Sequence, residues 1–172
     1  ELPEEVTTAM PAKKILHGSE YSLPECEFIA PENQQFKAWQ IDGTEYPVNA
    51  PVTVTADITV KALWKDSEKP TGEIKISENS WKAFLNNITF GLFFKDTQTV
   101  TITAADNSGE TVTVEYLLSA KELTKAELDG MTFTAYTAPF GIDPDNEYII
   151  YVRLTDTAGN MDYICSDGIV LD

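Results

Sequence analysis

The fold of this chain is decided by residues 21–66, which read YSLPECEFIAPENQQFKAWQIDGTEYPVNAPVTVTADITVKALWKD. β-Branched or aromatic residues alternate with polar ones at residues 52–55 and 59–64, which is the period of a half-buried strand. Residues 36–41 form a further run of strand-forming residues, and Asp42-Gly43 after it is typical of a tight hairpin turn. We therefore expect a small antiparallel β-unit here.

The core of this unit is expected to be aromatic and β-branched, because such residues dominate the buried face of a small sheet. The candidates are Phe36, Trp39, Tyr46, Val54, Val60 and Trp64. Trp39 and Trp64 could instead be exposed platforms for sugar rings, but both lie on the apolar phase of their strands, which favours the core. Cys26 is interpreted as a packed thiol, since the sole histidine, His17, is not fixed beside it as a base.

Residues 65–72, KDSEKPTG, are polar and contain both proline and glycine, which is typical of a short linker. From residue 73 the pattern indicates roughly seven short strands over about 100 residues, the numbers of an immunoglobulin-like sandwich. One helix is predicted in this half, with Thr124 as N-cap, Glu127 completing a capping box and Gly130 as its stop. The expected fold is mainly β, with domains at residues 1–66 and 73–172.

The first domain resembles the Listeria–Bacteroides repeat, a β-grasp-like module of bacterial surface and internalin-type proteins. The resemblance covers roughly residues 10–66 and is carried by Y-S-L-P-E-C-x-F-x-A-P-E-x-x-x-F-K-A-W, D-G-x-E-Y and V-T-V-T-A-D-x-T-V-x-A-L-W-K-D. Such repeats usually open with a strand of the kind V-x-F-x-x-N-G-G, whereas residues 6–12 here read VTTAMPA. We expect this first strand to be shortened or contributed by other residues.

The second domain is similar to the bacterial Ig-like domains of large exported proteins over about residues 73–172. The run around Tyr148 resembles a tyrosine corner, in which the hydroxyl binds a nearby backbone group. Residues 156–160, DTAGN, match a hairpin that recurs in such domains. The antibody subtype is excluded because its pair of cysteines and its tryptophan are missing from the pattern.

The chain is strongly acidic, with 12 basic and 28 acidic residues and a net charge of −16. This charge argues against nucleic acid and against anionic membrane surfaces, both of which demand clustered Lys and Arg. No apolar run approaches the roughly 20 residues of a membrane-spanning helix, so no membrane insertion is expected. The chain also opens without a methionine or a signal-peptide pattern, and we expect it to be a piece of a longer polypeptide.

Two turns contain oxygen-bearing side chains that could bind calcium, and the candidates are Asp106, Asp156 and Asn160. Calcium prefers oxygen ligands, but one carboxylate and one amide per loop fall short of the full set. Asp and Asn near Gly are also what tight turns require, and this interpretation is preferred. Cys26 and Cys165 are expected to be free thiols in different domains, and Asn87-Ile-Thr89 is interpreted as an incidental glycosylation triplet.

The sequence bears on three classes of function. The two resemblances imply an extracellular, non-catalytic structural or spacer segment of an adhesin-like bacterial cell-surface protein. The alternative is a module that binds a glycan or a host protein at the cell surface, which would need exposed aromatic residues or a large apolar patch. Catalysis is not expected, because no nucleophile, metal-ligand or phosphate-binding motif occurs, and neither a catalytic residue nor a cofactor is assigned.

Overall fold

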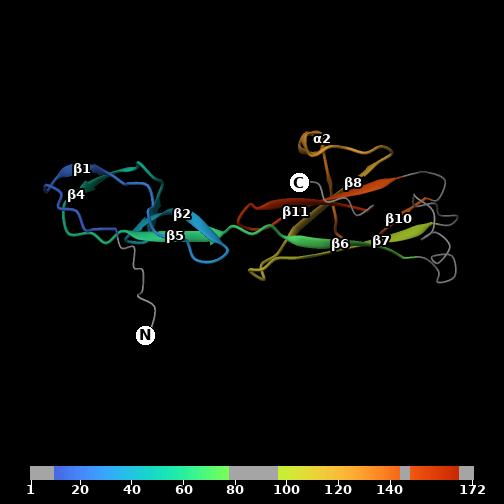
Figure 1. Ribbon diagram of the computed structural model, residues 1–172, viewed down its shortest axis with the longest axis horizontal. Coiled ribbons are helices and arrows are strands. Elements are labelled where there is room, and N and C mark those ends of the chain that lie inside the picture. Colours follow the sequence, from blue (N-terminus) through green and yellow to red (C-terminus); the bar gives the residue numbers. More distant parts are fainter. Residues whose placement is uncertain (1–9, 78–96, 144–147, 167–172) are drawn as a thin grey trace, which may run out of the picture. The chain divides into compact units, whose positions relative to one another are not determined.

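The computed structural model describes residues 10–77, 97–143 and 148–166, and the chain divides into two compact units, Glu1–Ser67 and Glu68–Asp172 (Figure 1). All strand pairs in the described residues are antiparallel. The described residues contain one helix, so the prediction of a mainly β fold is confirmed. The division after Ser67 falls inside the stretch that the sequence presents as a linker.

The N-terminal unit consists of two small sheets. Strand β1 (Ser19–Ser22) pairs with β4 (Pro51–Val54). Strand β2 (Gln34–Ile41) lies between β3 (Thr44–Tyr46) and β5 (Lys61–Asp66). The earliest described strand is β1. The sequence predicts a shortened or replaced opening strand near residues 6–12. Part of this segment lies in residues 1–9, outside the described part.

The β2–β3 hairpin turns at Asp42 and Gly43, as its sequence predicts. Both residues have positive φ values, 47° and 83°. Two successive residues in the left-handed region match the twist of the flanking strands, and a glycine reaches this region without steric cost. The turn thus fixes the register in which Trp39 stands opposite Tyr46.

The core of the N-terminal unit is built around Trp39, which is 2% exposed. Leu23 and Ile41 are buried with it, and neither was among the residues predicted from the sequence. The other predicted core residues are half-buried; they are Phe36, Tyr46, Val54, Val60 and Trp64. Phe36, Tyr46 and Val60 pack against this cluster. The ring of Trp64 contacts that of Phe36. Leu23 alternates with Tyr21, but the run is only three residues long and ends at Pro24, so the pattern alone did not identify Leu23 as core.

The connection between the two units is shorter than the sequence suggests. Strand β5 continues to Asp66, and β6 (Thr71–Ser77) begins with two residues that were assigned to the linker. Thr71 and Gly72 are in the ladder because they pair with Ala105 and Ala104. Only residues 67–70 remain between the strands.

The C-terminal unit contains two sheets. The first has the order β10-β7-β6, with β7 at Gln98–Ala105 and β10 at Phe140–Ile142. The second has the order β12-β11-β8-β9. Its strands are β8 (Thr113–Ser119), β9 (Thr134–Ala135), β11 (Ile149–Thr155) and β12 (Met161–Cys165).

A shared core joins these two sheets. Val100 and Ile102 of β7 are buried together with Ile150, Val152 and Leu154 of β11. Because the residues of one strand alternate between faces, the even-numbered residues of β11 all point toward the first sheet. The unit is therefore a β-sandwich-type fold.

The other face of the four-stranded sheet is covered as well. Tyr151, Tyr163 and Cys165 point to this side and pack against Leu123, Leu128 and Phe133 of the β8–β9 connection. This connection carries helix α2 (Lys125–Asp129), as the sequence predicts (Figure 1). We call residues 120–133 the cap segment. Its presence explains why residues on both faces of β11 are buried or half-buried.

The ends of α2 largely follow the predicted pattern. Thr124 Oγ1 accepts from Glu127 N, and a Glu127 carboxylate oxygen accepts from Thr124 N at 2.8 Å, which completes the capping box. The helix ends at Gly130, but with φ −91° rather than in the left-handed region that C-terminal glycines commonly adopt.

Candidate functional site

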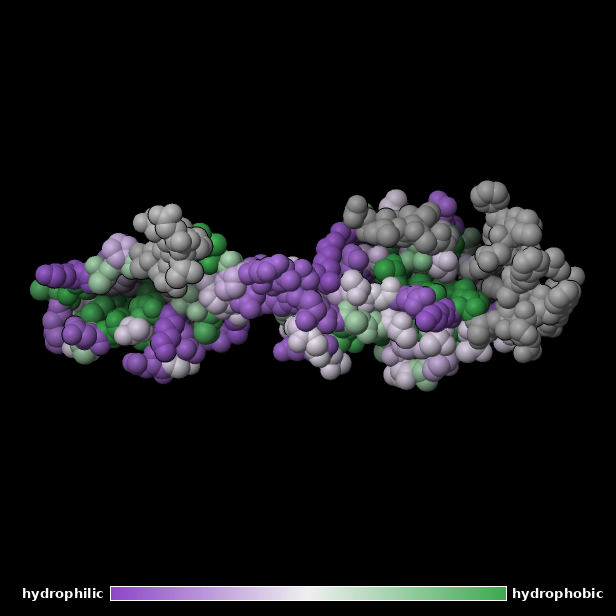
Figure 2. All heavy atoms as spheres, turned by 60° about the horizontal axis from the view of Figure 1, so that its bottom comes forward, coloured by the Kyte–Doolittle hydropathy of each residue, from purple (hydrophilic) through white to green (hydrophobic). Residues whose placement is uncertain are grey.

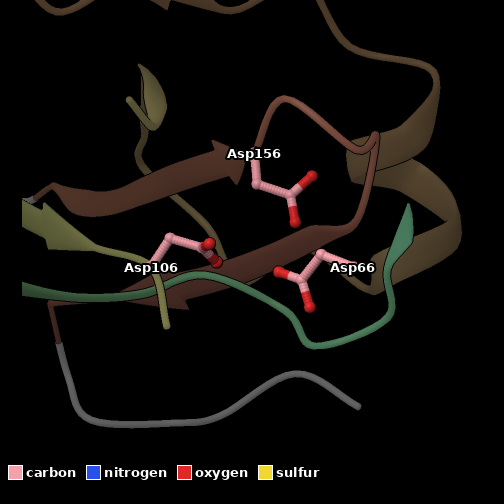
Figure 3. Close-up of side chains that lie close together, drawn as sticks. All are labelled: Asp66, Asp106 and Asp156. Atoms are coloured by element: carbon pink, nitrogen blue, oxygen red, sulfur yellow. The ribbon is translucent and has the colours of Figure 1, made fainter. Parts of the chain in front are cut away.

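The calcium candidates lie at the end of the sandwich where β7 and β11 both finish. Asp106 follows the last residue of β7, and Asp156 follows the last residue of β11. Their carboxylate oxygens approach within 4.8 Å (Figure 3). Asp66, drawn in the same view, is the last residue of β5 and belongs to the N-terminal unit. The structure thus brings together two residues that are 50 positions apart.

Asp156 is 6% exposed and holds the β11–β12 hairpin closed. Its carboxylate accepts from the backbone N and the side-chain Nδ2 of Asn160, both at 2.7 Å. The backbone N of Asp156 donates to the carbonyl of Asn160 at 3.1 Å. Gly159 completes the turn with φ +88°. A buried carboxylate requires such partners, because unpaired it would be costly to desolvate.

Asp106 organises the loop after β7 in a similar way. One carboxylate oxygen accepts from the backbone N of Ser108 at 3.0 Å and from the Ser108 hydroxyl. Gly109 then adopts φ +74°. A further hydrogen bond joins Thr157 to Glu110, so this loop and the β11–β12 hairpin are tied together.

These bonds assign a turn-forming role to all three candidates. Asp106 and Asp156 are brought together, whereas the side-chain amide of Asn160 is directed at Asp156. Two carboxylates fall short of the about six to eight oxygen ligands that Ca²⁺ takes. The hydrogen bonds of Asp106, Asp156 and Asn160 are those that tight turns require.

A second cluster, which the sequence did not reveal, surrounds the only arginine of the chain. Arg153 of β11 is paired with Glu115 of β8, and its Nε and Nη2 lie 2.8 and 2.7 Å from the same oxygen, Oε2 of Glu115. The Cζ atom of Arg153 lies 4.5 Å from the ring centroid of Phe133 in the cap segment. Strand pairing with opposite charges could have suggested the ion pair, but nothing in the pattern predicts which residue of the cap segment lies over it.

The electrostatics of this cluster favour the charged arginine. Burial alone would lower the pKa of Arg153, but the hydrogen bond and the charge of Glu115 outweigh burial and raise it above its ordinary value. The pKa of Tyr163 is also raised, first by burial and then by the hydrogen bond that its hydroxyl donates to Asp129 at 2.9 Å. The bond between Tyr163 and Asp129 holds α2 against the sheet.

Tyrosine hydroxyls tie the chain together at two backbone positions. The hydroxyl of Tyr151 accepts from Leu123 N at 2.7 Å, and that of Tyr136 accepts from Ile102 N at 3.0 Å. The sequence predicts such a tie at Tyr148, at the start of the same strand as Tyr151. In the described residues the tie is made three positions later, because Tyr151 points to the face on which the cap segment packs.

The aromatic residues that the structure describes are turned inward. All thirteen described Trp, Tyr and Phe residues are buried or half-buried. Trp39 donates its Nε1 hydrogen to the carbonyl of Pro24 at 2.7 Å, and its ring lies 5.0 Å from that of Phe36. Cys26 packs half-buried in the same cluster, and His17 is exposed.

The exposed large hydrophobic residues of the described part are all aliphatic. They are Leu16, Ile29, Ile58, Met131 and Met161. Figure 2 shows hydrophobic residues gathered in places on the drawn face of each unit, with hydrophilic residues around them. Trp81 and the triplet Asn87-Ile-Thr89 lie in residues 78–96, outside the described part. Exposed aliphatic residues that occur singly are a normal feature of protein surfaces.

Comparison with known proteins found no matching family model, no matching curated protein and no matching solved structure. Within the described residues, helices of the length and apolarity needed to cross a bilayer are absent.

Proposed function

We propose that this chain is a non-catalytic spacer segment of an exported, adhesin-like bacterial cell-surface protein. In this proposal residues 1–66 are a β-grasp-like module of the Listeria–Bacteroides repeat type and residues 73–172 are an Ig-like sandwich. The two resemblances in the sequence motivate the proposal. Two successive β-units joined by residues 67–70 support it, since this is the construction of a chain of modules.

The observation that carries the proposal is the inward orientation of the aromatic residues in the part of the chain that the structure describes. A glycan-binding face offers exposed aromatic rings, and a protein-binding face offers a contiguous apolar patch. Each of the thirteen described aromatic residues is instead at least half-buried. Of the two candidates for a sugar platform, Trp39 is 2% exposed and has its N–H paired with Pro24, and Trp64 is half-buried.

The acidic composition also supports a spacer. A net charge of −16 keeps such a segment soluble and discourages association with its own copies. Of the four described ion pairs, all but Arg153–Glu115 include a partner that is about half-exposed or more. Pairs of that kind contribute little to stability, so the surface charge mainly provides repulsion.

The proposal is tested by probing the labelled chain on a glycan array and on host-cell surfaces. We expect no specific retention on either. Saturable binding to one glycan that is competed by the free sugar would overturn the spacer function in favour of a binding module. Antibodies against the chain should label intact bacteria that produce it, and labelling only after lysis would contradict the extracellular location.

A further inference from the structure

We infer that the C-terminal unit is a load-bearing module, in which a pull along the chain is resisted by strands loaded in shear. The inference rests on the proposed function, because a spacer on a cell surface transmits force through its two ends. It concerns this unit alone and follows from where its first and last strands lie and in which direction they run.

The first and last described strands of this unit are neighbours. Strand β6 is an edge of the three-stranded sheet, and β12 is an edge of the four-stranded sheet. A Cβ atom built on Gly72 of β6 would stand 2.8 Å from Cδ1 of Leu154 and 3.4 Å from Cδ1 of Ile164 in β12. The backbone of β6 therefore lies directly on the side chains of the other sheet.

Both strands also run in the same direction. Strand β6 begins at Thr71, opposite Ala105, which precedes Asp106. Strand β12 begins at Met161, opposite Thr155, which precedes Asp156. Asp106 and Asp156 lie together, so both strands start at this end of the sandwich.

The chain consequently enters the unit at one end and leaves its last described strand at the other. After β12 the ladder continues to Ser166, whose backbone N donates to the carbonyl of Ile150 at 3.0 Å. Ile150 belongs to the start of β11, far along the strand from Asp156. Figure 1 shows β6 leading away from the linker toward that end.

This arrangement determines how a pull acts on the hydrogen bonds. The bonds of an antiparallel ladder are perpendicular to its strands. A force that draws Thr71 outward along β6 therefore acts on all seven residues of this strand against β7 at once. A force that separates Thr71 sideways from Ala105 breaks the pairs one after another. Forced unfolding depends on the height of the unfolding barrier, so the two geometries should differ in rupture force.

The contacts around the entry point support the same role. Pro70, immediately before β6, is among the fully buried residues. Lys69 pairs with Asp162 of β12 at 3.3 Å and links the incoming chain to the last strand. The lysine is 51% exposed, so this ion pair contributes little, and the ladder and the packing at Gly72 carry the load.

The test is single-molecule stretching of the full chain in two geometries. In the first, handles are attached at the N- and C-termini. In the second, the C-terminal handle is moved to a clickable residue in place of Thr111, which is exposed in the β7–β8 loop. The second geometry peels β6 from β7 beginning at Thr71. An unchanged thermal unfolding curve verifies that the substitution at residue 111 leaves the fold intact.

The two units are distinguished by the length of chain that each releases. The N-terminal unit has 67 residues and releases at most about 230 Å in both geometries. The C-terminal unit has 105 residues and releases at most about 370 Å when pulled by its ends. Between residues 68 and 111 it releases at most about 150 Å. The N-terminal unit is thus an internal standard that should rupture at the same force in both experiments.

We expect the C-terminal unit to rupture at a clearly higher force when pulled by the termini than when pulled at residue 111. Equal forces, or a lower force in the terminal geometry, would overturn the load-bearing role. The outcome is independent of the binding experiments, so a specific glycan ligand would refute the spacer function without changing the ratio of forces. Equal rupture forces in the two geometries would refute the load-bearing role without contradicting the spacer function.

Discussion

Arg153 and Glu115 meet across the paired strands β11 and β8, with two guanidinium nitrogens within 2.8 Å of one carboxylate oxygen. Both side chains are 24% exposed, and Phe133 lies against the guanidinium. Because the pair is largely removed from water, salt screens it less than an ion pair on the surface. It also joins the cap segment to the sheet.

We expect a double-mutant cycle with Arg153→Met and Glu115→Gln to give a coupling free energy of about 1–2 kcal/mol. With Arg153→Lys, only a part of this coupling free energy should remain, because an ammonium group cannot reproduce the two N–H bonds that the planar guanidinium makes. Urea unfolding of the four proteins provides the measurement. The matched control is the exposed pair Lys37–Glu45, for which we expect about 0–0.5 kcal/mol; equal couplings for the two pairs would contradict the prediction.

Gly72→Ala should destabilise the C-terminal unit by about 1–3 kcal/mol, because overpacking forces neighbouring groups to move. The new methyl group would stand 2.8 Å from both Leu154 Cδ1 and the carbonyl oxygen of Thr103, and the latter is backbone. Thermal unfolding by circular dichroism measures the loss. Gly130→Ala is the control, since its nearest neighbour is Glu127 O at 3.6 Å and a change within about 0.5 kcal/mol is expected. A comparable loss at both positions would refute the close-packing argument.

Trp39→Phe should destabilise the N-terminal unit by at least about 1–3 kcal/mol, because the carbonyl of Pro24 loses its donor in a part-buried site. The smaller ring also leaves unfilled space beside Phe28 and Phe36. Trp64→Phe is the comparison, since Trp64 is half-buried at the margin of the cluster. Denaturant titration should show a clearly smaller loss for Trp64. The reverse order would mean that Trp39 is not the centre of this core.

Thr124→Ala should cost about 1 kcal/mol near neutral pH by removing the N-cap of α2. The difference in unfolding free energy between wild type and Thr124→Ala should also depend on pH. The backbone and side-chain hydrogen bonds of Thr124 lower the pKa of Glu127 below its ordinary 4.5 in the folded state. A lowered folded pKa gives stability that is present above the ordinary pKa and is lost as the pH falls through the folded pKa.

Thr124→Ala removes the bond from the hydroxyl to Glu127 but keeps the bond from the backbone N. The part of the free-energy difference that comes from the hydroxyl bond should therefore be lost below about pH 4.5, so that the difference shrinks. Urea unfolding at a series of pH values measures it. Thr132→Ala, at an exposed position in the same segment, should show neither the loss nor the pH dependence. A difference that stays constant into acid would show that the bond from the Thr124 hydroxyl to Glu127 does not contribute to the stability of the cap.

Local signals in this sequence predicted local structure well. The alternating runs became strands, Asp42-Gly43 became the hairpin turn, and Thr124 to Gly130 became the one described helix. In each case the physical cause lies within a few neighbouring residues: strand period, positive φ and a capping box. The turn chemistry of Asp156 and Asn160 belongs to the same class.

Contacts between distant segments could not be predicted in this way. The sequence places Arg153 on a strand, but the ring of Phe133 reaches it only through the path of the cap segment. Leu23 is 1% exposed because Trp39, sixteen residues later, packs beside it. Alternation identifies which face of a strand is apolar, but it does not identify what covers that face, and for β11 both faces are covered.

The covering of β11 on both faces has a consequence for the order in which the unit is assembled. One core requires Ile150, Val152 and Leu154, and the other requires Tyr151. In a chain that emerges from its N-terminal end, neither core can close until this strand has emerged, although β6 and β7 precede it by many residues. Contacts between such distant segments slow folding. We expect the N-terminal unit to be folded while the nascent sandwich still exposes strand edges, which makes the interval before residue 155 the period in which this chain most needs a chaperone.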